Sequence, residues 1–514
     1  MGAEAIQPAV LLVPFPAQGH VTPMLHLARA LAAHGVAATV AVPDFIHRRF
    51  AAATTGRATG ATTDGCGGVE LASIPSGIPL AESGKDAEPP GFGAIVHAME
   101  NHMPAHLERM LLTGFRGGRV ASLVVDVLAS WAVPVAERCG VPAAGFWPAM
   151  LASYRAVAAI PELLGKGIIS ESGTPAVESN HPDNDGNDDG QDKQVIRGLR
   201  ILPGQLELSA KELPWLVGDS ATQKARFAFW LQTLRRARAF RSVLVNSFPA
   251  EASSNTASAD DDVGVQGPRV LPVGPLMLAA GGNAERAKCE GGETRSSQEN
   301  PSMWQADETC IRWLDAQPAG SVVYVSFGSW VGSIGHDKIR DLALGLESTG
   351  RPFLWALKDD PSWRAGLPCG YAERVAGRGK LVDWAPQDDV LAHEAVRCYL
   401  THCGWNSTVE AIHHGVRMLC CPVSGDQFIN CAYITRVWEV GLRLGSVISR
   451  DGVRDCIERI MDGAEGTRLK ERMEALRQRV VTAEAWCLAQ GNVASFVDEI
   501  KREHPLLMQI YNIL

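Results

Sequence analysis

Apolar runs and helical spacings alternate along the first part of the chain. Residues 9–15 are continuously apolar, which predicts a strand buried on both faces of a sheet. Apolar residues then recur at helical spacing over residues 24–32, and Thr22 with Pro23 predicts the cap and first turn of that helix. Residues 36–42 form the next apolar run. This order predicts a strand–helix–strand unit with parallel strands.

Two polar side chains stand directly after apolar runs of this half. His20 follows the run 9–15, and Asp126 follows the run 122–125, after which a helical pattern begins near Trp131. The carboxyl ends of parallel strands meet at one edge of a sheet, where ligands bind. We therefore expect His20 and Asp126 to lie at the same edge, where they could meet.

The alternation resumes in the second half and predicts a second α/β domain. Helical patterns cover 337–348 and the residues after 405, between short apolar runs at 321–327, 353–357, 381–382, 398–401 and 416–421. A length of 514 residues suits two domains. We expect an N-terminal domain over 1–265, a linker over 266–305 and a C-terminal domain over 306–485. Residues 486–514 should form a helix and tail that pack back on the N-terminal domain.

Composition narrows the class of protein. With 46% hydrophobic and 20% charged residues the chain is typical of a globular protein, and a net charge of −9 argues against binding to a nucleic-acid backbone. The 12 cysteines include no C-x-x-C pair, a pattern typical of reduced thiols in the cytoplasm. The sequence predicts neither a signal peptide nor a membrane span. Cytoplasmic localisation is the expectation.

A strand that passes through a glycine into a helix predicts a phosphate site in the second half. The apolar run 398–401 leads through His402 and Gly404 into a helical pattern, so free backbone N–H groups and the positive end of the helix dipole point to one place. Two pairs of residues flank this turn on neighbouring segments: Trp384, Gln387, Asp426 and Gln427.

Residues 384–427 resemble the signature box of plant-type UDP-glycosyltransferases. They read WAPQDDVLAHEAVRCYLTHCGWNSTVEAIHHGVRMLCCPVSGDQ, and the motifs WAPQ, THCGWNS and the final DQ fall in the register of that family. PFPAQGH near the N-terminus and VVDVLASWAVPVA further on resemble two more of its segments. The resemblance implies the GT-B fold, an α/β architecture of two Rossmann-like domains facing a central cleft.

The resemblance also implies roles for individual residues. His20 would be the general base and Asp126 would orient it. Trp384 would stack on uracil, with Ala385 beside it, and Gln387 and Glu410 would bind the ribose. The diphosphate would be held by the Gly404 turn and by four side chains: Ser329, His402, Asn406 and Ser407. The sugar hydroxyls would be held by three further residues: Trp405, Asp426 and Gln427.

The implied reaction is an inverting transfer of a hexose to a hydroxyl or carboxyl of a small lipophilic metabolite. A neutral imidazole can take a hydroxyl proton near neutral pH, and a carboxylate on its other nitrogen fixes the tautomer. Gln427 at the end of the box resembles the family members that use glucose, so UDP-glucose is the expected co-substrate. The resemblance implies no metal, no other cofactor and a monomer.

Other readings of the same residues remain open. His20 could simply pack at a helix start, and Asp126 could be a helix N-cap. Ser407 and Glu410 have the spacing of a capping box, which would serve the helix alone. A UDP-sugar binder with weak catalysis, or an enzyme that uses another UDP-sugar, fits the same motifs. A Rossmann oxidoreductase does not, because no G-x-G-x-x-G follows the first strand.

Three departures from the family pattern stand near or after the box. Arg417 occupies a position where proline is usual, and we expect it to loosen the turn before Met418 and so the placement of Asp426. Cys421 replaces a tryptophan, and residues 490–493 replace a Gly-Ser-Ser. The acidic runs at 183–185 and 260–262 are explained by composition rather than by metal binding. The apolar tail 506–514 has no assigned role.

Overall fold

The structure is a computed structural model that describes residues 7–55, 69–79, 90–114, 118–175, 208–209, 212–249, 267–277, 304–329, 331–445 and 447–511. The chain divides into two compact units. Unit 1 comprises Met1–Leu151, Thr233–Gln305 and Val481–Leu514, and unit 2 comprises Ala152–Gln232 and Ala306–Val480. The expected N-terminal domain ran to residue 265, whereas residues 152–232 group with the second unit. The runs 183–185 and 260–262 lie outside the described residues.

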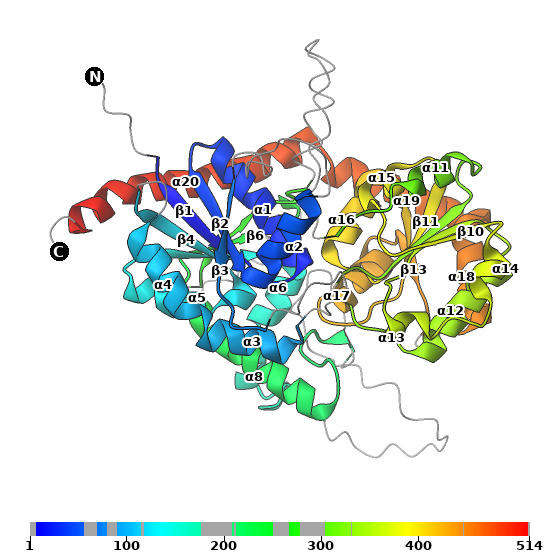
Figure 1. The fold of residues 1–514 in the computed structure, drawn as a ribbon, viewed down its shortest axis with the longest axis horizontal. Coiled ribbons are helices and arrows are strands. Elements are labelled where there is room, and N and C mark those ends of the chain that lie inside the picture. The colour runs from blue at the N-terminus through cyan, green and yellow to red at the C-terminus, as the bar shows by residue number, and fades with distance from the viewer. Residues whose placement is uncertain are drawn as a thin grey trace, which may run out of the picture. The chain divides into compact units, whose positions relative to one another are not determined.

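Unit 1 is built on a seven-stranded sheet in which every strand pair is parallel (Figure 1). Its strands, in spatial order, are β3 (Glu70–Ile74), β2 (Ala37–Pro43), β1 (Ala9–Val13), β4 (Val120–Asp126), β5 (Ala143–Trp147), β6 (Ser242–Val245) and β7 (Arg269–Pro272). The central strands β1 and β4 are buried along their whole length, as their unbroken apolar runs predict.

Helices connect these strands. They are α1 (Gln18–Ala33), α2 (Asp44–Thr55), α3 (Phe92–Asn101), α4 (Met103–Thr113), η1 (Val127–Ala129), α5 (Ala132–Arg138), α6 (Leu151–Ala158), α7 (Ile160–Gly165) and α8 (Ser220–Ala237). Helix α1 begins one turn earlier than predicted, with Ala17 as its N-cap and Pro23 inside it. The predicted cap, Thr22, is buried and its hydroxyl accepts a hydrogen bond from Gln18 Nε2 at 3.2 Å.

Unit 2 repeats the plan with a six-stranded parallel sheet (Figure 1). Its strands, in spatial order, are β10 (Gly379–Val382), β9 (Phe353–Ala356), β8 (Val322–Ser326), β11 (Val396–Thr401), β12 (Arg417–Cys420) and β13 (Gly441–Arg443). Its helices are α11 (Thr309–Asp315), α12 (His336–Ser348), α13 (Pro361–Arg364), α14 (Tyr371–Val375), α15 (Gln387–Ala392), α16 (Trp405–His414), α17 (Gln427–Ala432), η4 (Tyr433–Val437), α18 (Arg450–Met461) and α19 (Gly463–Val480).

The last helix, α20 (Ala483–Tyr511), belongs to unit 1. Asn492 Nδ2 donates to Pro272 O at 2.7 Å, and Lys501 Nζ donates to His34 O at 2.9 Å. The altered segment 490–493 thus supplies an anchor of this helix. The expected linker began at residue 266, but Arg269–Pro272 is the seventh strand of the first sheet. Most of the expected linker, residues 278–303, lies outside the described residues.

Arg417 does not loosen its turn as expected. Its side chain is buried, and Nη1 donates to Ile460 O at 2.8 Å and to Gly466 O at 2.7 Å. These carbonyls stand at the end of α18 and in the first turn of α19, so the guanidinium ties strand β12 to both helices. The expectation was wrong because it considered only the backbone preference of the position and not a long side chain that can reach helix carbonyls.

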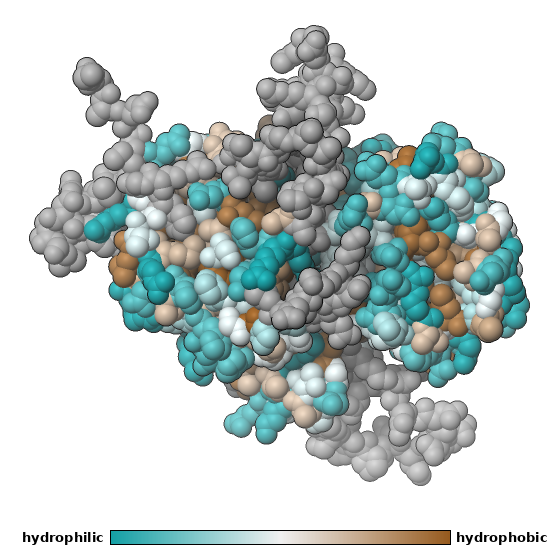
Figure 2. All heavy atoms as spheres, in the orientation of Figure 1, coloured by the Kyte–Doolittle hydropathy of each residue, from teal (hydrophilic) through white to brown (hydrophobic). Residues whose placement is uncertain are grey.

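The surface mixes polar and apolar side chains, as the face drawn in Figure 2 shows. The large apolar side chains that are exposed in the described residues are spread over several elements: Leu112, Val270, Val437, Val447 and Leu488. Single exposed side chains of this kind are normal for a folded domain. No helix of the described residues combines the length and apolar character needed to cross a bilayer.

Candidate active site

Both sheets place their candidate residues at a topological switch point. In unit 1 the strand order reverses between β1 and β4, and in unit 2 between β8 and β11. Connections leave such a pair of strands on opposite faces of the sheet, so a crevice opens at their carboxyl ends. His20 and Asp126 follow β1 and β4, and the turns at Gly328 and Gly404 follow β8 and β11.

His20 and Asp126 form a hydrogen-bonded pair in unit 1. The distance from His20 Nδ1 to Asp126 Oδ2 is 2.8 Å, and the side chains are 24% and 0% exposed. The other carboxylate oxygen, Oδ1, accepts from Leu128 N–H at 2.9 Å. An ionised carboxylate can only accept, so Nδ1 carries the imidazole proton and Nε2 carries the lone pair. Asp126 therefore caps the helix η1 and also holds His20. On the sequence alone these two roles were alternatives.

In unit 2, His402 is enclosed by two glycines. A Cβ atom on Gly328 would lie 2.8 Å from His402 Nε2, and one on Gly404 would lie 2.4 Å from it. Gly328 also has a φ of 71°, which favours glycine. Burial, reinforced by the nearby Lys358 ammonium, lowers the pKa of His402 to about 4. His402 is therefore a neutral imidazole at neutral pH.

The N-terminus of α16 follows the Gly404 turn directly. Gly404 is its N-cap, and no side chain of the described residues caps it. Ser407 lies within the first turn, and Glu410 bonds elsewhere, so the capping-box reading of Ser407 and Glu410 is wrong. The strand runs through residue 404 directly into the helix, and the helix therefore starts before the serine. Uncapped N–H groups at a helix N-terminus suit a phosphate.

Gln387 is the centre of a hydrogen-bond network. Its Nε2 donates to Ser407 Oγ at 3.0 Å and to Glu410 Oε2 at 2.5 Å. Its Oε1 accepts from the hydroxyls of Tyr324 at 3.2 Å and Tyr399 at 2.9 Å. The amide oxygen thus faces the two phenols, and the amide nitrogen faces Ser407 and Glu410. Gln387 thus orients Glu410 and Ser407.

The two tyrosines come from adjacent central strands. Tyr324 of β8 and Tyr399 of β11 are register partners, and their rings stack with centroids 4.9 Å apart. Burial raises the pKa of both phenols, so the hydroxyls remain donors. Desolvation also raises the pKa of Glu410 to about 8, although the bond from Gln387 opposes this shift. A buried acid with a strongly raised pKa, held by a fixed donor, is typical of a ligand site.

Asp426 and Gln427 begin α17 and are held by that helix and its preceding turn. Gln427 Oε1 accepts from Val423 N–H at 2.9 Å and from Ser424 N–H at 3.0 Å, which directs its Nε2 away from the turn. Asn430 Nδ2 donates to Asp426 Oδ2 and to Cys403 O, both at 3.0 Å. Asn430 therefore joins the expected sugar-binding pair to the His402 turn.

The remaining predicted donor residues lie on unit 2 as well. Trp384 is half-buried, and its carbonyl accepts from Asp307 N–H at 2.9 Å. Ala385 and Trp405 are buried, whereas Ser329 and Asn406 are half-buried. All predicted donor residues thus belong to unit 2, and the predicted catalytic pair belongs to unit 1.

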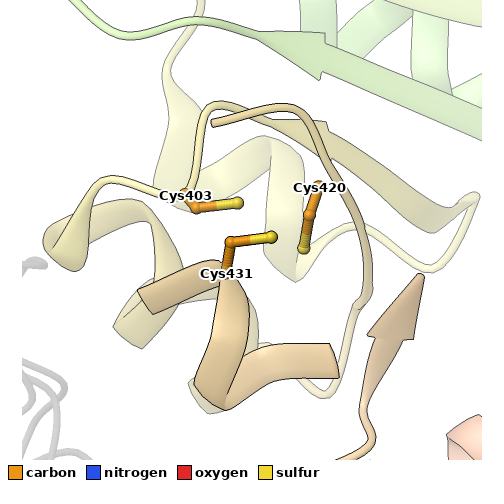
Figure 3. A group of neighbouring side chains, drawn as sticks. All are labelled: Cys403, Cys420 and Cys431. Carbon is orange, nitrogen blue, oxygen red and sulfur yellow. The ribbon is translucent and has the colours of Figure 1, made fainter. Parts of the chain in front are cut away.

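Three buried cysteines meet behind the His402 turn. The Sγ atoms of Cys403, Cys420 and Cys431 lie within 4.8 Å of one another, and Figure 3 shows their side chains pointing toward a common centre. Burial raises the pKa of the Cys403 and Cys420 thiols, and interaction with these two thiols lowers the pKa of Cys431. Cys403 Sγ donates to Thr401 O at 3.7 Å. The trio could supply three sulfur ligands, but no fourth His, Cys, Asp or Glu of the described residues joins it, and structural zinc takes four.

The sequence reading missed several of these residues. Tyr324, Tyr399 and Asn430 looked like ordinary core positions, and no cluster was expected from cysteines at 403, 420 and 431. A signal did exist for Asn430, because it stands four residues after Asp426 on a helix. Tyr324 and Tyr399 lie in apolar runs that predict buried strands, and a buried tyrosine hydroxyl needs a hydrogen-bond partner.

The chain is similar to known proteins over nearly its whole length. Residues 7–147 match the family "Glycosyltransferase, N-terminal domain", and residues 300–473 match "UDP-glucoronosyl and UDP-glucosyl transferase". UDP-glycosyltransferase 82A1 of Arabidopsis thaliana is 40% identical over 508 residues, which cover 96% of this chain and 99% of the relative. The chain belongs to the plant UDP-glycosyltransferase family. A further relative of this UDP-glycosyltransferase, the DIMBOA UDP-glucosyltransferase BX8 of Zea mays, is 33% identical over 484 residues, 91% of this chain and 93% of the relative.

Solved structures of the family share the fold of this UDP-glycosyltransferase. Os79 from O. sativa in complex with UDP aligns with a TM-score of 0.72 at 26% identity, over 96% of this chain and 100% of that chain. A UDP complex of UDP-glucose: anthocyanidin 3-O-glucosyltransferase aligns with a TM-score of 0.72 at 25% identity, over 96% and 99%. The predicted GT-B fold with two Rossmann-like α/β domains and the predicted enzyme class are confirmed.

Proposed function

We propose that this UDP-glycosyltransferase transfers glucose from UDP-glucose, with inversion at the anomeric carbon, to a hydroxyl or carboxyl of a small lipophilic metabolite. The names of the relatives support glucose as the sugar and a small acceptor: one is a DIMBOA UDP-glucosyltransferase, and a solved one is described as capable of glucosylating indoxyl. Gln427, the last residue of the signature box, also supports glucose, because it resembles the family members that use this sugar. A different UDP-sugar is the alternative for the donor.

The observation that carries this proposal is the His20–Asp126 pair. Its 2.8 Å bond leaves the lone pair on Nε2, which takes the acceptor proton while the acceptor oxygen attacks the anomeric carbon. Positive charge then develops on the imidazole, and the buried Asp126 carboxylate stabilises it. The acceptor oxygen gains the bond to carbon, and the carbon–oxygen bond to the diphosphate breaks. A UDP-sugar binder with weak catalysis would have no use for this pair.

The donor roles follow the signature box. Trp384 and Ala385 hold uracil, and Gln387 and Glu410 hold ribose. The diphosphate and the sugar are held by the remaining residues: Ser329, His402, Gly404, Asn406 and Ser407 for the diphosphate, and Trp405, Asp426 and Gln427 for the sugar. Fixed N–H donors at α16 stabilise the charge that gathers on the leaving UDP, so no divalent ion is required. We further propose a monomer in the cytoplasm, where the cysteines, all free thiols in the described residues, stay reduced.

One experiment separates these possibilities. UDP release is measured with UDP-glucose and competing UDP-sugars, a panel of phenols and terpenols, and a chelator in half of the reactions. The glycoside is then examined by NMR, and an inverting enzyme gives the β-glucoside from the α-linked donor. A His20→Ala variant should bind UDP and transfer no sugar. Full activity of that variant, or an α-linked product, contradicts the mechanism.

A further inference from the structure

Lys358 stands at the carboxyl end of β9, the strand next to β8. Its side chain is half-buried, and Nζ donates to Val331 O at 2.5 Å. Val331 lies two residues after Ser329, so this bond connects the lysine to the segment that follows the Gly328 turn. The ammonium also lies 5.7 Å from the centroid of the Trp363 ring. Lys358 is thus held in a fixed position at the ligand edge of the sheet.

Among the described residues, Lys358 has no carboxylate as an ion-pair partner. Two neighbouring carboxylates, Asp359 and Asp383, pair with Arg364, and Asp360 Oδ1 accepts from Ser362 N–H at 2.7 Å. Within the described part of unit 2, no carboxylate forms an ion pair with Nζ. Burial lowers the pKa of Lys358 to about 8, against a smaller opposite effect of Asp360. A desolvated cation without an anion is costly, and an anionic ligand would remove that cost.

Lys358 follows β9, and the neighbouring strand β8 leads into the Gly328 turn. The Lys358 ammonium disfavours protonation of His402 and adds to the larger effect of burial in lowering the pKa of that imidazole. His402 itself lies between Gly328 and Gly404, the two turns that would receive the phosphates. Lys358 and the N-terminus of α16 therefore direct positive potential to one region.

We propose that Lys358 is a diphosphate-binding residue of the donor site. This inference rests on the proposed function, since it needs the UDP-sugar to occupy these turns. When the bond from the anomeric carbon to the β-phosphate oxygen breaks, its electron pair stays on that oxygen and the diphosphate gains negative charge. A preorganised cation stabilises this charge together with the N–H donors of α16, a role that many enzymes give to a metal ion.

The test compares ligands that share uridine and differ in phosphate. Dissociation constants for UDP, UMP and uridine are measured by calorimetry with the wild type, Lys358→Met, Lys358→Arg and Lys470→Met. The last is a matched control, because Lys470 is an exposed lysine of α19 in the same unit. We expect Lys358→Met to weaken UDP binding about tenfold to a hundredfold, the range for loss of a hydrogen bond to a charged group, and to leave uridine binding unchanged. Lys358→Arg should restore part of the UDP affinity, and the control should match the wild type.

Two kinds of failure are distinguishable. If the wild type does not bind UDP, the proposed function fails. If the wild type binds UDP and Lys358→Met binds it equally well, only the assignment of Lys358 fails. Equal weakening of UDP and uridine by Lys358→Met also overturns the assignment, because the lysine would then act through its bond to Val331 and the shape of the site. Thermal melting of each variant reports whether it folds.

Discussion

His20 and Asp126 are joined by a 2.8 Å hydrogen bond between Nδ1 and Oδ2, although 106 residues separate them in the sequence. The bond exists because β1 and β4 are adjacent parallel strands whose carboxyl ends meet at the switch point of the sheet. Asp126 is buried, and its second oxygen is held by Leu128 N–H, so its orientation is fixed. This geometry leads to the first prediction.

Replacement of the carboxylate should disable the base without disturbing the donor site. Asp126→Asn removes the negative charge that stabilises the imidazolium, and we expect kcat to fall about a hundredfold to ten-thousandfold. The dissociation constant for UDP should stay within about twofold, because the predicted donor residues belong to unit 2. Steady-state kinetics and calorimetry measure the two quantities.

The control for this substitution is Glu108→Gln. Glu108 is a partly exposed residue of α4 paired with Arg138, so it undergoes the same acid-to-amide change away from the switch point. Its kcat should match the wild type. An Asp126→Asn enzyme with wild-type kcat would show that His20 needs no carboxylate to act.

The hydroxyls of Tyr324 and Tyr399, which donate to Gln387, should matter for binding of UDP-glucose rather than for the chemical step. Tyr399→Phe removes the 2.9 Å bond to Gln387 Oε1 and frees the amide to rotate away from Glu410 and Ser407. We expect KM for UDP-glucose to rise roughly threefold to tenfold with kcat little changed, and stability to fall by about 1 kcal/mol, as for one lost hydrogen bond.

Tyr371→Phe is the matched control for Tyr399→Phe. Tyr371 is also buried in unit 2, and its hydroxyl donates to Ala343 O at 3.1 Å, away from Gln387. Its loss should lower stability by a similar amount and leave KM unchanged. If both variants raise KM alike, the effect comes from general loosening of unit 2 and the role given to Tyr399 is wrong.

Glu410 should link both stability and uridine binding to pH. Its pKa is raised from the usual 4.5 to about 8, so the folded protein holds more protons than the unfolded chain between these values. Stability therefore decreases as pH rises from about 4.5 to about 8 and levels off above that range. Glu410→Gln removes this decrease, so its melting temperature should exceed that of the wild type by a margin that grows to a few degrees near pH 8.

The affinity of the wild type for uridine should rise with pH, whereas its stability decreases. In the proposed role of Glu410, the ribose hydroxyls would donate to the ionised carboxylate, so the affinity should rise with pH, by at most about tenfold per unit, and reach a plateau near pH 8. Calorimetry at pH 6, 7, 8 and 9 measures this profile, with Glu394→Gln, an exposed residue next to β11, as the control. A flat wild-type profile would mean that Glu410 does not titrate in this range.

How far the sequence predicts this molecule can be seen from His20, Glu410 and Arg417. Apolar runs place strands within a few residues, and parallel topology then brings His20 to Asp126, so the sequence alone predicts that pair. The partner of Glu410 depends on strand register and rotamers, which no periodicity encodes, and the capping-box spacing pointed to a local bond that does not form. Arg417 shows the same limit, because its partners lie in helices more than forty residues further on.

Arg417 should contribute to stability and not to chemistry. Arg417→Met leaves the carbonyls of Ile460 and Gly466 without their buried donor, and we expect a loss of about 2–4 kcal/mol in the free energy of unfolding. Chemical denaturation measures it, with Arg397→Met, an exposed arginine of β11, as the control. Below the melting transition kcat should match the wild type. A large fall in kcat for the folded variant would restore a role for this position in placing Asp426.

Chelation should leave the enzyme active. The proposed donors to the diphosphate are protein groups, so EDTA or a stronger chelator should change neither kcat nor KM by more than about twofold, given that loss of a charge-stabilising group costs far more than this. Kinetics before and after dialysis against the chelator measure the effect, and elemental analysis of the purified protein reports any metal retained.

The elemental analysis is the decisive measurement, because a metal buried in the three-cysteine cluster could resist dialysis. Cys431→Ser removes the sulfur that lies within 4.8 Å of those of Cys403 and Cys420 and leaves a residue that ligates soft metals poorly. If the cluster is thiol packing, this variant should lose about 1–2 kcal/mol of stability, as for a changed buried hydrogen bond, while the metal content of wild type and variant stays equally low. A stoichiometric metal in the wild type that Cys431→Ser lacks, with lower donor affinity in the variant, would show instead that the His402 turn is held by a metal site. The enzyme would then require a structural metal to shape its donor site, and the proposal that it needs no metal would fail.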